Sequence, residues 1–282
     1  MRKAIIQLRS VSVEYPSGDG TIKRVLQNID IDIEDGEFVS VVGQTGRGKS
    51  TLLRLILGEQ LPTRGSVTVG GKQRSQPDRL CGYVPQKYSL FPDKTVLDNV
   101  TFGPDVSRFG AASWFHPARR KEIRKVREEA LELLTNLGLD KTDAQKYPHQ
   151  LSGGMQQRVA IAQALIMRPP ILLMDEAFSA LDPGTRRGMQ RLIKDLWSQT
   201  RTTIVFVTHN TREAVCLGTR VVALGGASVL DTAVPHIRFD SSEDDVQFFI
   251  RKIETGVNAD TNVGCASEKL QKSSLSAVAL SS

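Results

Sequence analysis

Residues 43–51 read Gly43-Gln44-Thr45-Gly46-Arg47-Gly48-Lys49-Ser50-Thr51, between the β-branched run 38–42 and the leucine-rich run 52–57. This order of strand, glycine turn and helix, with the spacing G-x4-G-K-[ST], is typical of a phosphate-binding loop. Glycines let backbone N–H groups curl around phosphate oxygens, and the helix start adds its positive dipole end. We expect Lys49 to reach the β- and γ-phosphates of a triphosphate and Ser50 to bind Mg²⁺; the alternative is a glycine turn with a surface lysine.

The composition is that of a soluble protein with one large α/β domain or two smaller ones. The 282 residues are 40% hydrophobic and 24% charged, with a net charge of +6. A modest positive charge suits a phosphate-binding protein, and the aromatic residues are not interleaved with basic ones, so we expect no nucleic-acid partner. Three distant cysteines, Cys81, Cys216 and Cys265, favour a reducing compartment. We find neither a signal peptide nor an apolar run near the about 18 residues of a membrane span.

Hydrophobic periodicity predicts a β-rich start, a helical middle and an α/β end. Alternation or short apolar runs predict strands, over 5–15, 25–33, 38–42, 66–69, 81–84, 171–174, 203–207 and 219–224. Helical spacing predicts helices, over 96–100, 118–137, 153–167, 184–200 and 211–217. The stretch 104–117 is predicted as a loop, and residues after 235 as an extension with one helix at 243–253 and a mobile Ser/Ala-rich end. The alternation after residue 171 indicates a parallel α/β core.

The predicted helix from Arg119 carries six basic residues. They are Arg119, Arg120, Lys121, Arg124, Lys125 and Arg127. We interpret them as a solvated face, with Val126, Ala130, Leu133 and Leu134 turned inward. A docking patch for an acidic partner or for lipid headgroups is the alternative.

Two carboxylates end the apolar run 171–174. In parallel sheets ligands lie at the carboxyl ends of strands, so we expect Asp175 near the phosphate-binding loop, where it helps to hold Mg²⁺. Glu176 is then placed to polarise water for attack on the γ-phosphate. Downstream of a phosphate-binding loop, this pair indicates nucleotide hydrolysis.

A second anion site is predicted at Leu151-Ser152-Gly153-Gly154-Met155-Gln156, where serine and glycines precede a helix. The order of the phosphate-binding loop, Gln86, this segment, Asp175-Glu176, Leu181-Asp182 and His209 resembles the ATPase subunit of ABC transporters over about residues 4–230. The resemblance implies a P-loop NTPase cassette with a RecA-like core, an antiparallel β subdomain and a helical signature subdomain. We expect the ATPase domain at 1–230, with the helical subdomain inserted at about 87–160, and an extension at 231–282.

The resemblance also implies roles for single residues. Tyr15 stacks on adenine, residues 43–51 bind the phosphates, and Gln86 contacts Mg²⁺ and reports the nucleotide state. His209 contacts the γ-phosphate and Asp182 crosses a dimer seam. The segment with Ser152, Gly153, Gly154 and Gln156 seals the γ-phosphate of the opposite subunit. Catalysis is thus assigned to Glu176, His209, Lys49 and Gln86, and Mg²⁺ binding to Ser50, Gln86 and Asp175.

Partners follow from the same resemblance. We expect a head-to-tail dimer with two ATP molecules, formed with a copy or a close paralogue, together with separate transmembrane permease subunits. We also expect a periplasmic or lipid-anchored solute-binding protein as a partner. The protein itself is expected to lie peripherally on the cytoplasmic face of the inner membrane. Residues 82–92 and Tyr147-Pro148 look like the nitrate, sulfonate and taurine importer group with its urea- and guanidine-related branch. An exporter subunit and a soluble ABC ATPase for assembly or remodelling are the alternatives.

The permease is expected to dock near Gln86 and residues 87–99. Tyr88, Leu90 and Phe91 are the candidate apolar contacts. The alternative is that these three side chains pack the helical subdomain.

Overall fold

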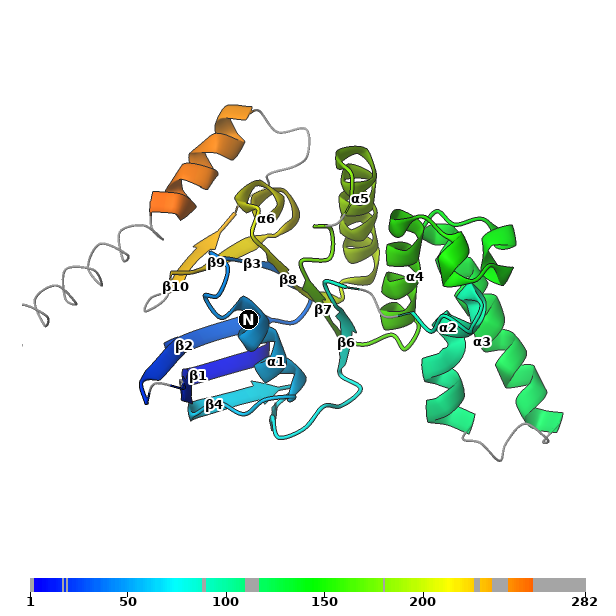
Figure 1. The fold of residues 1–282 in the computed structure, drawn as a ribbon, viewed down its shortest axis with the longest axis horizontal. Helices are drawn as coiled ribbons and strands as arrows, with labels where there is room; N and C mark the ends of the chain where they lie inside the picture. Colours follow the sequence, from blue (N-terminus) through cyan, green and yellow to red (C-terminus); the bar gives the residue numbers. More distant parts are fainter. Residues whose placement is uncertain are drawn as a thin grey trace, which may run out of the picture. The chain divides into compact units, whose positions relative to one another are not determined.

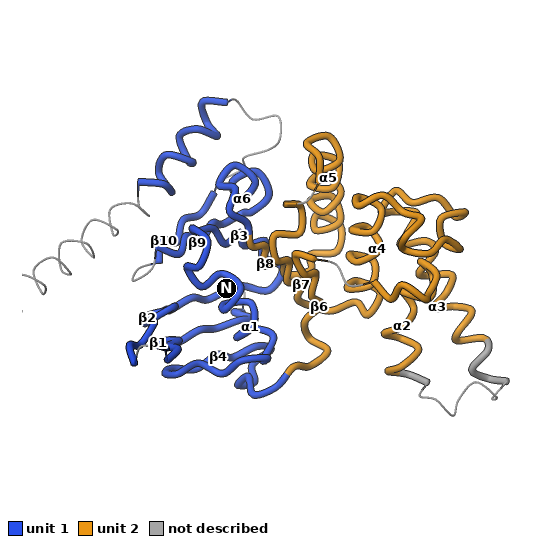
Figure 2. Tube along the Cα trace, in the orientation of Figure 1, with its two compact units in different colours: residues 1–76, 208–282 blue, residues 77–207 orange. Residues whose placement is uncertain are grey.

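The structure is a computed structural model that describes residues 3–16, 18, 20–87, 90–109, 117–179, 181–225, 229–234 and 243–255. Of residues 108, 109 and 117–120 it describes the backbone only. The chain divides into unit 1, residues 1–76 and 208–282, and unit 2, residues 77–207 (Figure 2). Tyr88 and most of the predicted extension, including its Ser/Ala-rich end, lie outside the described residues.

Unit 1 contains an antiparallel sheet, shown with β1, β2 and β4 side by side in Figure 1. Its strands, in the order β2-β1-β4-β5, are β1 (Ala4–Pro16), β2 (Ile22–Glu34), β4 (Arg64–Val69) and β5 (Lys72–Gln73). The predicted alternation is confirmed, since Ile6, Leu8, Val11 and Val13 are buried along β1. The register shifts near Ser10, which has φ 49°, as expected of a bulge.

Unit 1 also holds the strand that leads into the phosphate-binding loop. Strand β3 (Phe38–Val42) is buried throughout and pairs in parallel with β9 (Arg220–Leu224). A continuous apolar run is typical of such a strand. Helix α6 (Thr211–Leu217) packs on both strands, and helix α1 (Lys49–Leu57) follows β3.

The start of the predicted extension belongs to the structure of unit 1. Strand β10 (Val229–Ala233), which we did not predict, pairs antiparallel with β9. A helix over 243–255 matches the prediction; its Val246 and Ile253 are 2% and 1% exposed in a core shared with α6 and β9. Glu243 forms a two-pronged ion pair with Arg212 of α6. These contacts fix the helix to α6.

The described residues of unit 2 include three parallel strands in the order β8-β7-β6. They are β6 (Cys81–Val84), β7 (Ile171–Asp175) and β8 (Thr203–Thr208), and helix α5 (Pro183–Thr200) connects β7 with β8. Every residue of β7 and β8 is buried. The predicted parallel α/β arrangement is therefore present.

The remaining elements described in unit 2 are helices, as predicted. The helices are α2 (Val96–Pro104), the π-helix η1 (Asp105–Phe109), α3 (Pro117–Asn136), the 3-10 helices η2 (Lys141–Gln145) and η3 (Pro148–Gln150), and α4 (Gly153–Leu165). The prediction of a loop from residue 104 was wrong for its first part, because α2 continues into η1. Pro104 has no N–H for the α-helical ladder, and the wider π turn follows it.

Helix α3 has the predicted two faces. Val126, Ala130 and Leu134 are buried, and Leu133 is half-buried. Lys121, Arg124 and Lys125 are exposed. Arg127 is different, because its guanidinium lies 2.7 Å from the Asp98 carboxylate of α2. The exposed cations agree with a solvated face, and the docking patch stays a prediction.

Candidate nucleotide site

The loop between β3 and α1 has the backbone of an anion cradle. Gly46 and Gly48 have φ of 81° and 90°, the left-handed region that glycine enters without strain. A Cβ on Gly48 would lie 2.6 Å from Cδ2 of Leu26, so a larger residue there would force Leu26 to move. Helix α1 begins at the next residue, Lys49, which places its N-terminal N–H groups at the loop.

Lys49 is the cation of this loop. It is 5% exposed, and its Nζ donates to the carbonyl oxygens of Gly43 at 2.7 Å and Gln44 at 3.1 Å. The amine is thus curled over the loop, at the positive end of the α1 dipole. Ser50 is exposed beside it. A buried ammonium, helix N–H groups and an exposed hydroxyl fit a triphosphate, which is the chemistry predicted for residues 43–51.

Two other predicted residues belong to unit 1. The half-buried Tyr15, near the end of β1, donates its hydroxyl to Oε1 of Gln60 at 2.8 Å. His209 is exposed directly after β8. The Thr208 hydroxyl donates to Glu213 at 2.7 Å and accepts from the N–H of Asn210 at 3.0 Å. The backbone on both sides of His209 is therefore fixed.

Unit 2 brings Gln86 and Glu176 together. Asp175 ends β7 at 8% exposure, and the N–H of Glu176 donates to the carbonyl of Val207 at 2.9 Å. Glu176 has φ 45°, a left-handed backbone that is uncommon for a residue with a side chain and often marks functional sites. Nε2 of Gln86 donates to Oε2 of Glu176 at 3.0 Å. The two residues predicted to act on water and on Mg²⁺ thus touch each other.

The predicted second anion site is the N-terminus of α4. Ser152 is the N-cap, and its Oγ accepts from the N–H of Met155 at 3.3 Å. Gly153 is exposed, and a Cβ on Gly154 would lie 2.7 Å from Cγ2 of Thr185. The Gln156 side-chain nitrogen donates to the loop's own carbonyls, Pro148 at 2.9 Å among them. Gln156 therefore shapes the loop that holds Ser152.

Asp182 caps helix α5. Its carboxylate accepts from the N–H groups of Gly184 and Thr185, both at 3.1 Å. The Thr185 hydroxyl and these N–H groups lower the pKa of Asp182. Arg186 donates to the carbonyls of Phe178, Ser179 and Leu181, and so fixes the backbone at these three residues.

Sequence reasoning missed three residues that support this site. Glu213 had a signal, because Asn210 three residues earlier forms an N-cap pattern with it. Arg186 and Gln60 had none, since each bonds to atoms that only the fold brings near. A surface glutamine or arginine in a helix or loop reads as solvated.

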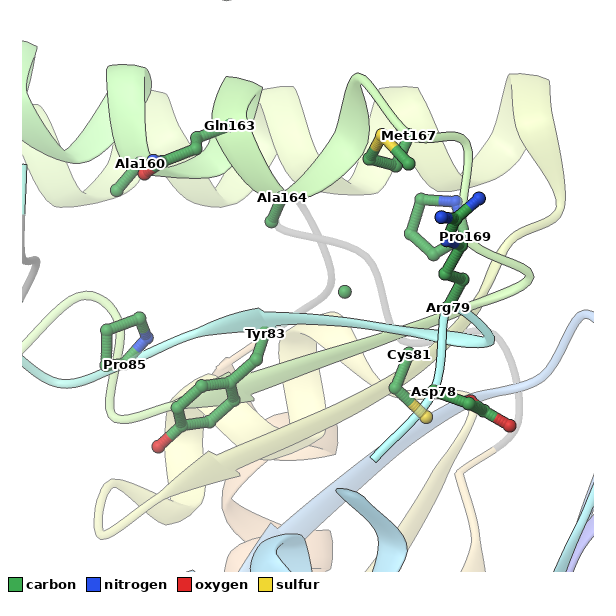
Figure 3. Close-up of a pocket in the computed structure, with 11 residues that line it drawn as sticks. Asp78, Arg79, Cys81, Tyr83, Pro85, Ala160, Gln163, Ala164, Met167 and Pro169 are labelled. Carbon is green, nitrogen blue, oxygen red and sulfur yellow. The ribbon is translucent and has the colours of Figure 1, made fainter. Parts of the chain in front are cut away.

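Unit 2 also contains a cavity of about 370 Å³ (Figure 3). It lies between strand β6 with the residues before it and the second half of α4 with the turn that follows. Tyr83 and Pro85 line one end, and Arg79, Met167 and Pro169 the other. Pro85 directly precedes Gln86, so this cavity borders the segment that holds the predicted Mg²⁺ contact.

The donor set predicted for Mg²⁺ fits a hard cation. Ser50, Gln86 and Asp175 supply a hydroxyl, an amide and a carboxylate oxygen, which are the ligand types that Mg²⁺ prefers. Gln86 bonds to Glu176 through its nitrogen, so its oxygen remains available for a cation.

Strand β3, the loop and helix α1 define a P-loop nucleoside triphosphatase. The family model described as ABC transporter matches residues 26–179. The aliphatic sulfonates import ATP-binding protein SsuB of Bacillus cereus is 35% identical over 243 residues, 84% of this chain and 90% of that protein. The sulfate/thiosulfate import ATP-binding protein CysA of Mesorhizobium japonicum is 44% identical over 202 residues, 71% of this chain and 56% of that protein. The chain thus spans little more than half of the latter.

Solved structures agree. The dimeric post-hydrolysis state of the ATP-binding cassette MJ0796 with ADP and Pi superposes with a TM-score of 0.69 at 34% identity, covering 82% of this chain and 99% of that one. The chain belongs to the ABC transporter family, and it is an ABC ATPase with the cassette fold. The predicted family, fold class and enzyme class are confirmed.

The relatives bear on partners as well. The importer subunits among them do not favour the exporter or remodelling alternatives. Importer ATP-binding subunits are membrane-associated and act with permeases, and the cassette with ADP and Pi is a dimer. Within the described ranges, no helix combines the length and apolar character needed to cross the bilayer.

Proposed function

We propose that this protein hydrolyses ATP to power solute uptake through a separate membrane permease, from the cytoplasmic face of the inner membrane. The observation that carries the proposal is Lys49, buried and curled over a glycine loop at the start of α1. The similarity to sulfonate and sulfate import subunits supports the direction of transport.

Unit 1 would bind the nucleotide through its base and its phosphates. Residues 43–51 offer backbone N–H groups, and Lys49 offers its ammonium, to the β- and γ-phosphates. Tyr15 offers a half-buried ring whose face stacks on adenine. His209, held between Thr208 and Asn210, donates to the γ-phosphate as negative charge develops on it.

Unit 2 would supply the groups that act on the water and the metal. Glu176 accepts the proton of the attacking water as general base, and Gln86 orients its carboxylate. Gln86 and Asp175 would be ligands of Mg²⁺, and Ser50, which belongs to unit 1, is the third ligand proposed. When bound, Mg²⁺ neutralises phosphate charge. The rigid backbone of Glu176, fixed by the bond to Val207, keeps the base in place.

The remaining predicted residues would face a second ATPase subunit. Ser152 and the glycines after it present a capped helix N-terminus, which is suited to the γ-phosphate of the opposite nucleotide. Asp182 would lie at the seam. If each subunit contacts the nucleotide of the other in this way, the two subunits form a closed head-to-tail dimer with two-fold symmetry. ATP then holds the pair together, and hydrolysis releases it.

We place permease docking at the cavity beside β6. Phe91 is a weaker candidate than we expected, because its ring packs on Phe102 at 4.5 Å and Asn99 holds its backbone. A cytoplasmic segment of the permease bound in the cavity would contact Pro85, and Gln86 is the next residue along the chain. Docking there can move the residue that orients Glu176.

The variant Gln163→Trp tests this docking site, because it fills the cavity from α4. We expect loss of co-purification with the permease and of transport, while the basal ATPase activity of the isolated subunit persists. Glu132→Trp on the exposed face of α3 is the matched control. Normal assembly of the Gln163 variant would exclude the cavity as the docking site.

The solute is proposed to be a sulfonate-, nitrate- or taurine-like anion or a urea- or guanidine-like molecule, delivered by a periplasmic or lipid-anchored binding protein. Radiolabelled uptake should be measured in a strain that lacks the gene and carries either the wild type or Glu176→Gln. We expect uptake of a solute of these classes to need the wild-type subunit. Equal uptake of all of them without it would refute the solute assignment.

A further inference from the structure

Gln60 lies in the loop between α1 and β4 and contacts the ring predicted to stack on adenine. The Tyr15 hydroxyl donates to Oε1 of Gln60 at 2.8 Å, and both side chains are half-buried. The partner of this bond is 45 residues away along the chain. The bond therefore joins the end of strand β1 to the segment after helix α1.

The end of helix α1 determines where Gln60 lies. Gly58 has φ 83°, and its N–H donates to the carbonyls of Arg54 and Leu55. The N–H of Glu59 also donates to Arg54, at 3.0 Å. This glycine-capped helix end has a defined geometry. Gln60 is thus rigidly attached to the helix that begins with Lys49.

The loop between α1 and β4 is also hydrogen-bonded to strand β1. The N–H of Thr63 donates to the carbonyl of Ser12 at 2.8 Å, and its Oγ1 accepts from the N–H of Glu14 at 3.0 Å. These two bonds fix the backbone just before Tyr15. The direction of the phenol ring is left open by these two bonds, and the hydrogen bond that the Tyr15 hydroxyl donates to Gln60 fixes it.

We propose that Gln60 is a positioning residue for nucleotide binding. It holds the Tyr15 hydroxyl, so that the ring face stays at a set distance from Lys49, the group that binds the phosphates. This inference rests on the proposed adenine contact of Tyr15. A ring fixed before binding loses less side-chain entropy when the base stacks on it.

The expected effect is on affinity, not on turnover. Base stacking is equally strong before and during phosphate cleavage, and such uniform binding changes KM but not kcat. Loss of one hydrogen bond of ordinary net strength should raise KM for ATP by about three- to tenfold. Inorganic tripolyphosphate has no base, so its binding to Lys49 should not change.

The test uses the full chain with Gln60→Leu, Tyr15→Phe and the double variant. Because both substitutions delete the same bond, we expect each single variant to raise KM for ATP several-fold and the double variant to add nothing. Gln60→Glu keeps an acceptor and should restore a wild-type KM. Gln73→Leu, exposed on β5, is the control. Competition by tripolyphosphate should be equal in all five variants.

Additive rises in KM, or weaker tripolyphosphate binding in the Gln60 variants, would overturn the inference, because they indicate general damage to the loop. Tyr15→Ala separates this failure from that of the proposed function. If Tyr15→Ala raises KM while Gln60→Leu and Tyr15→Phe do not, the positioning role is refuted and the adenine contact stands. If Tyr15→Ala leaves KM unchanged, the adenine contact itself is refuted.

Discussion

At the scale of single residues, the half-buried Glu176 is held both at its backbone and at its side chain. Its backbone is left-handed, its N–H is bonded to Val207, and its side chain accepts from Gln86. A carboxylate that must take a proton from one particular water benefits from such fixed geometry. Gln86 directly follows Pro85, which lines the cavity. A change at the cavity can therefore reach Glu176, the proposed base, through Gln86.

Replacing Glu176 by Gln should therefore reduce ATP hydrolysis by about 10²- to 10⁴-fold, the usual contribution of a general base. ATP binding should persist, because the phosphate-binding loop is untouched. Phosphate release and nucleotide binding are the measurements, with Glu128→Gln on the exposed face of α3 as control. Hydrolysis at the wild-type rate would remove Glu176 as the base.

Glu213 supports His209 through its neighbours. The variant Glu213→Leu deletes the acceptor of the Thr208 hydroxyl and leaves that buried hydroxyl without this bond. We expect kcat to fall while KM for ATP changes little, because His209 is proposed to act on charge that develops during cleavage. Glu213→Gln keeps an acceptor and should retain most activity. An equal loss in both variants would contradict this explanation.

At the scale of elements, the glycines show how closely neighbouring segments are packed. A Cβ on Gly82 of β6 would lie 2.8 Å from the carbonyl of Ala164 and from Cγ of Pro169. Gly82→Ala should destabilise the protein by about 1–3 kcal/mol, since neither group can move easily. Gly188 of α5 has nothing within 4 Å, so Gly188→Ala should stabilise by about 0.5–1 kcal/mol. Urea unfolding midpoints that shift in the same direction would contradict this contrast.

The helix over 243–255 is attached to α6 partly by charge. The Arg212 guanidinium and the Gln247 amide lower the pKa of Glu243 to about 2, from an ordinary value near 4.5. A lowered pKa stabilises the folded state above pH 4.5, and this contribution disappears as the pH falls toward 2. It is small and salt-sensitive, because Glu243 is exposed.

The difference in Tm between the wild type and Glu243→Gln measures this contribution. We expect a constant difference above about pH 5 that shrinks toward pH 3, and a smaller one at high salt. Asp244→Gln, at the next position of the same helix, should not reproduce the trend. A difference that grows as the pH falls would contradict a lowered pKa of Glu243 in the folded protein.

Most elements were predictable, and the exceptions share a cause. Clear apolar patterns such as those of β3, β7 and α5 are decided locally, and the bounds of these three elements agree with the predictions to within one residue. Strands β5 and β10 were missed, because short strands of mixed polarity become strands through pairing with β4 and β9. Motifs revealed the chemical residues, whereas Gln60, Arg186 and the cavity depend on tertiary contacts.

At the scale of the whole molecule, unit 1 presents a phosphate-binding loop and unit 2 a capped helix start, both with exposed residues. One nucleotide needs one phosphate-binding loop, so the second anion site that we propose at the start of α4 would serve a second copy of the nucleotide. A head-to-tail pair satisfies both sites with two ATP molecules. The dimeric cassette with ADP and Pi is consistent with this arrangement.

The Glu176→Gln variant should accordingly sediment as a dimer with ATP and Mg²⁺ and as a monomer without nucleotide, because blocked hydrolysis keeps both triphosphates in place. Adding Ser152→Glu places a carboxylate where the opposite γ-phosphate is proposed to bind. Like charges in a water-poor seam repel strongly, so the double variant should stay monomeric while each chain still binds ATP. Ser75→Glu, an exposed site before unit 2, should leave the dimer intact. If the Ser152 variant dimerises as well as its control, the capped start of α4 does not face a nucleotide, and the seam must be built from other residues.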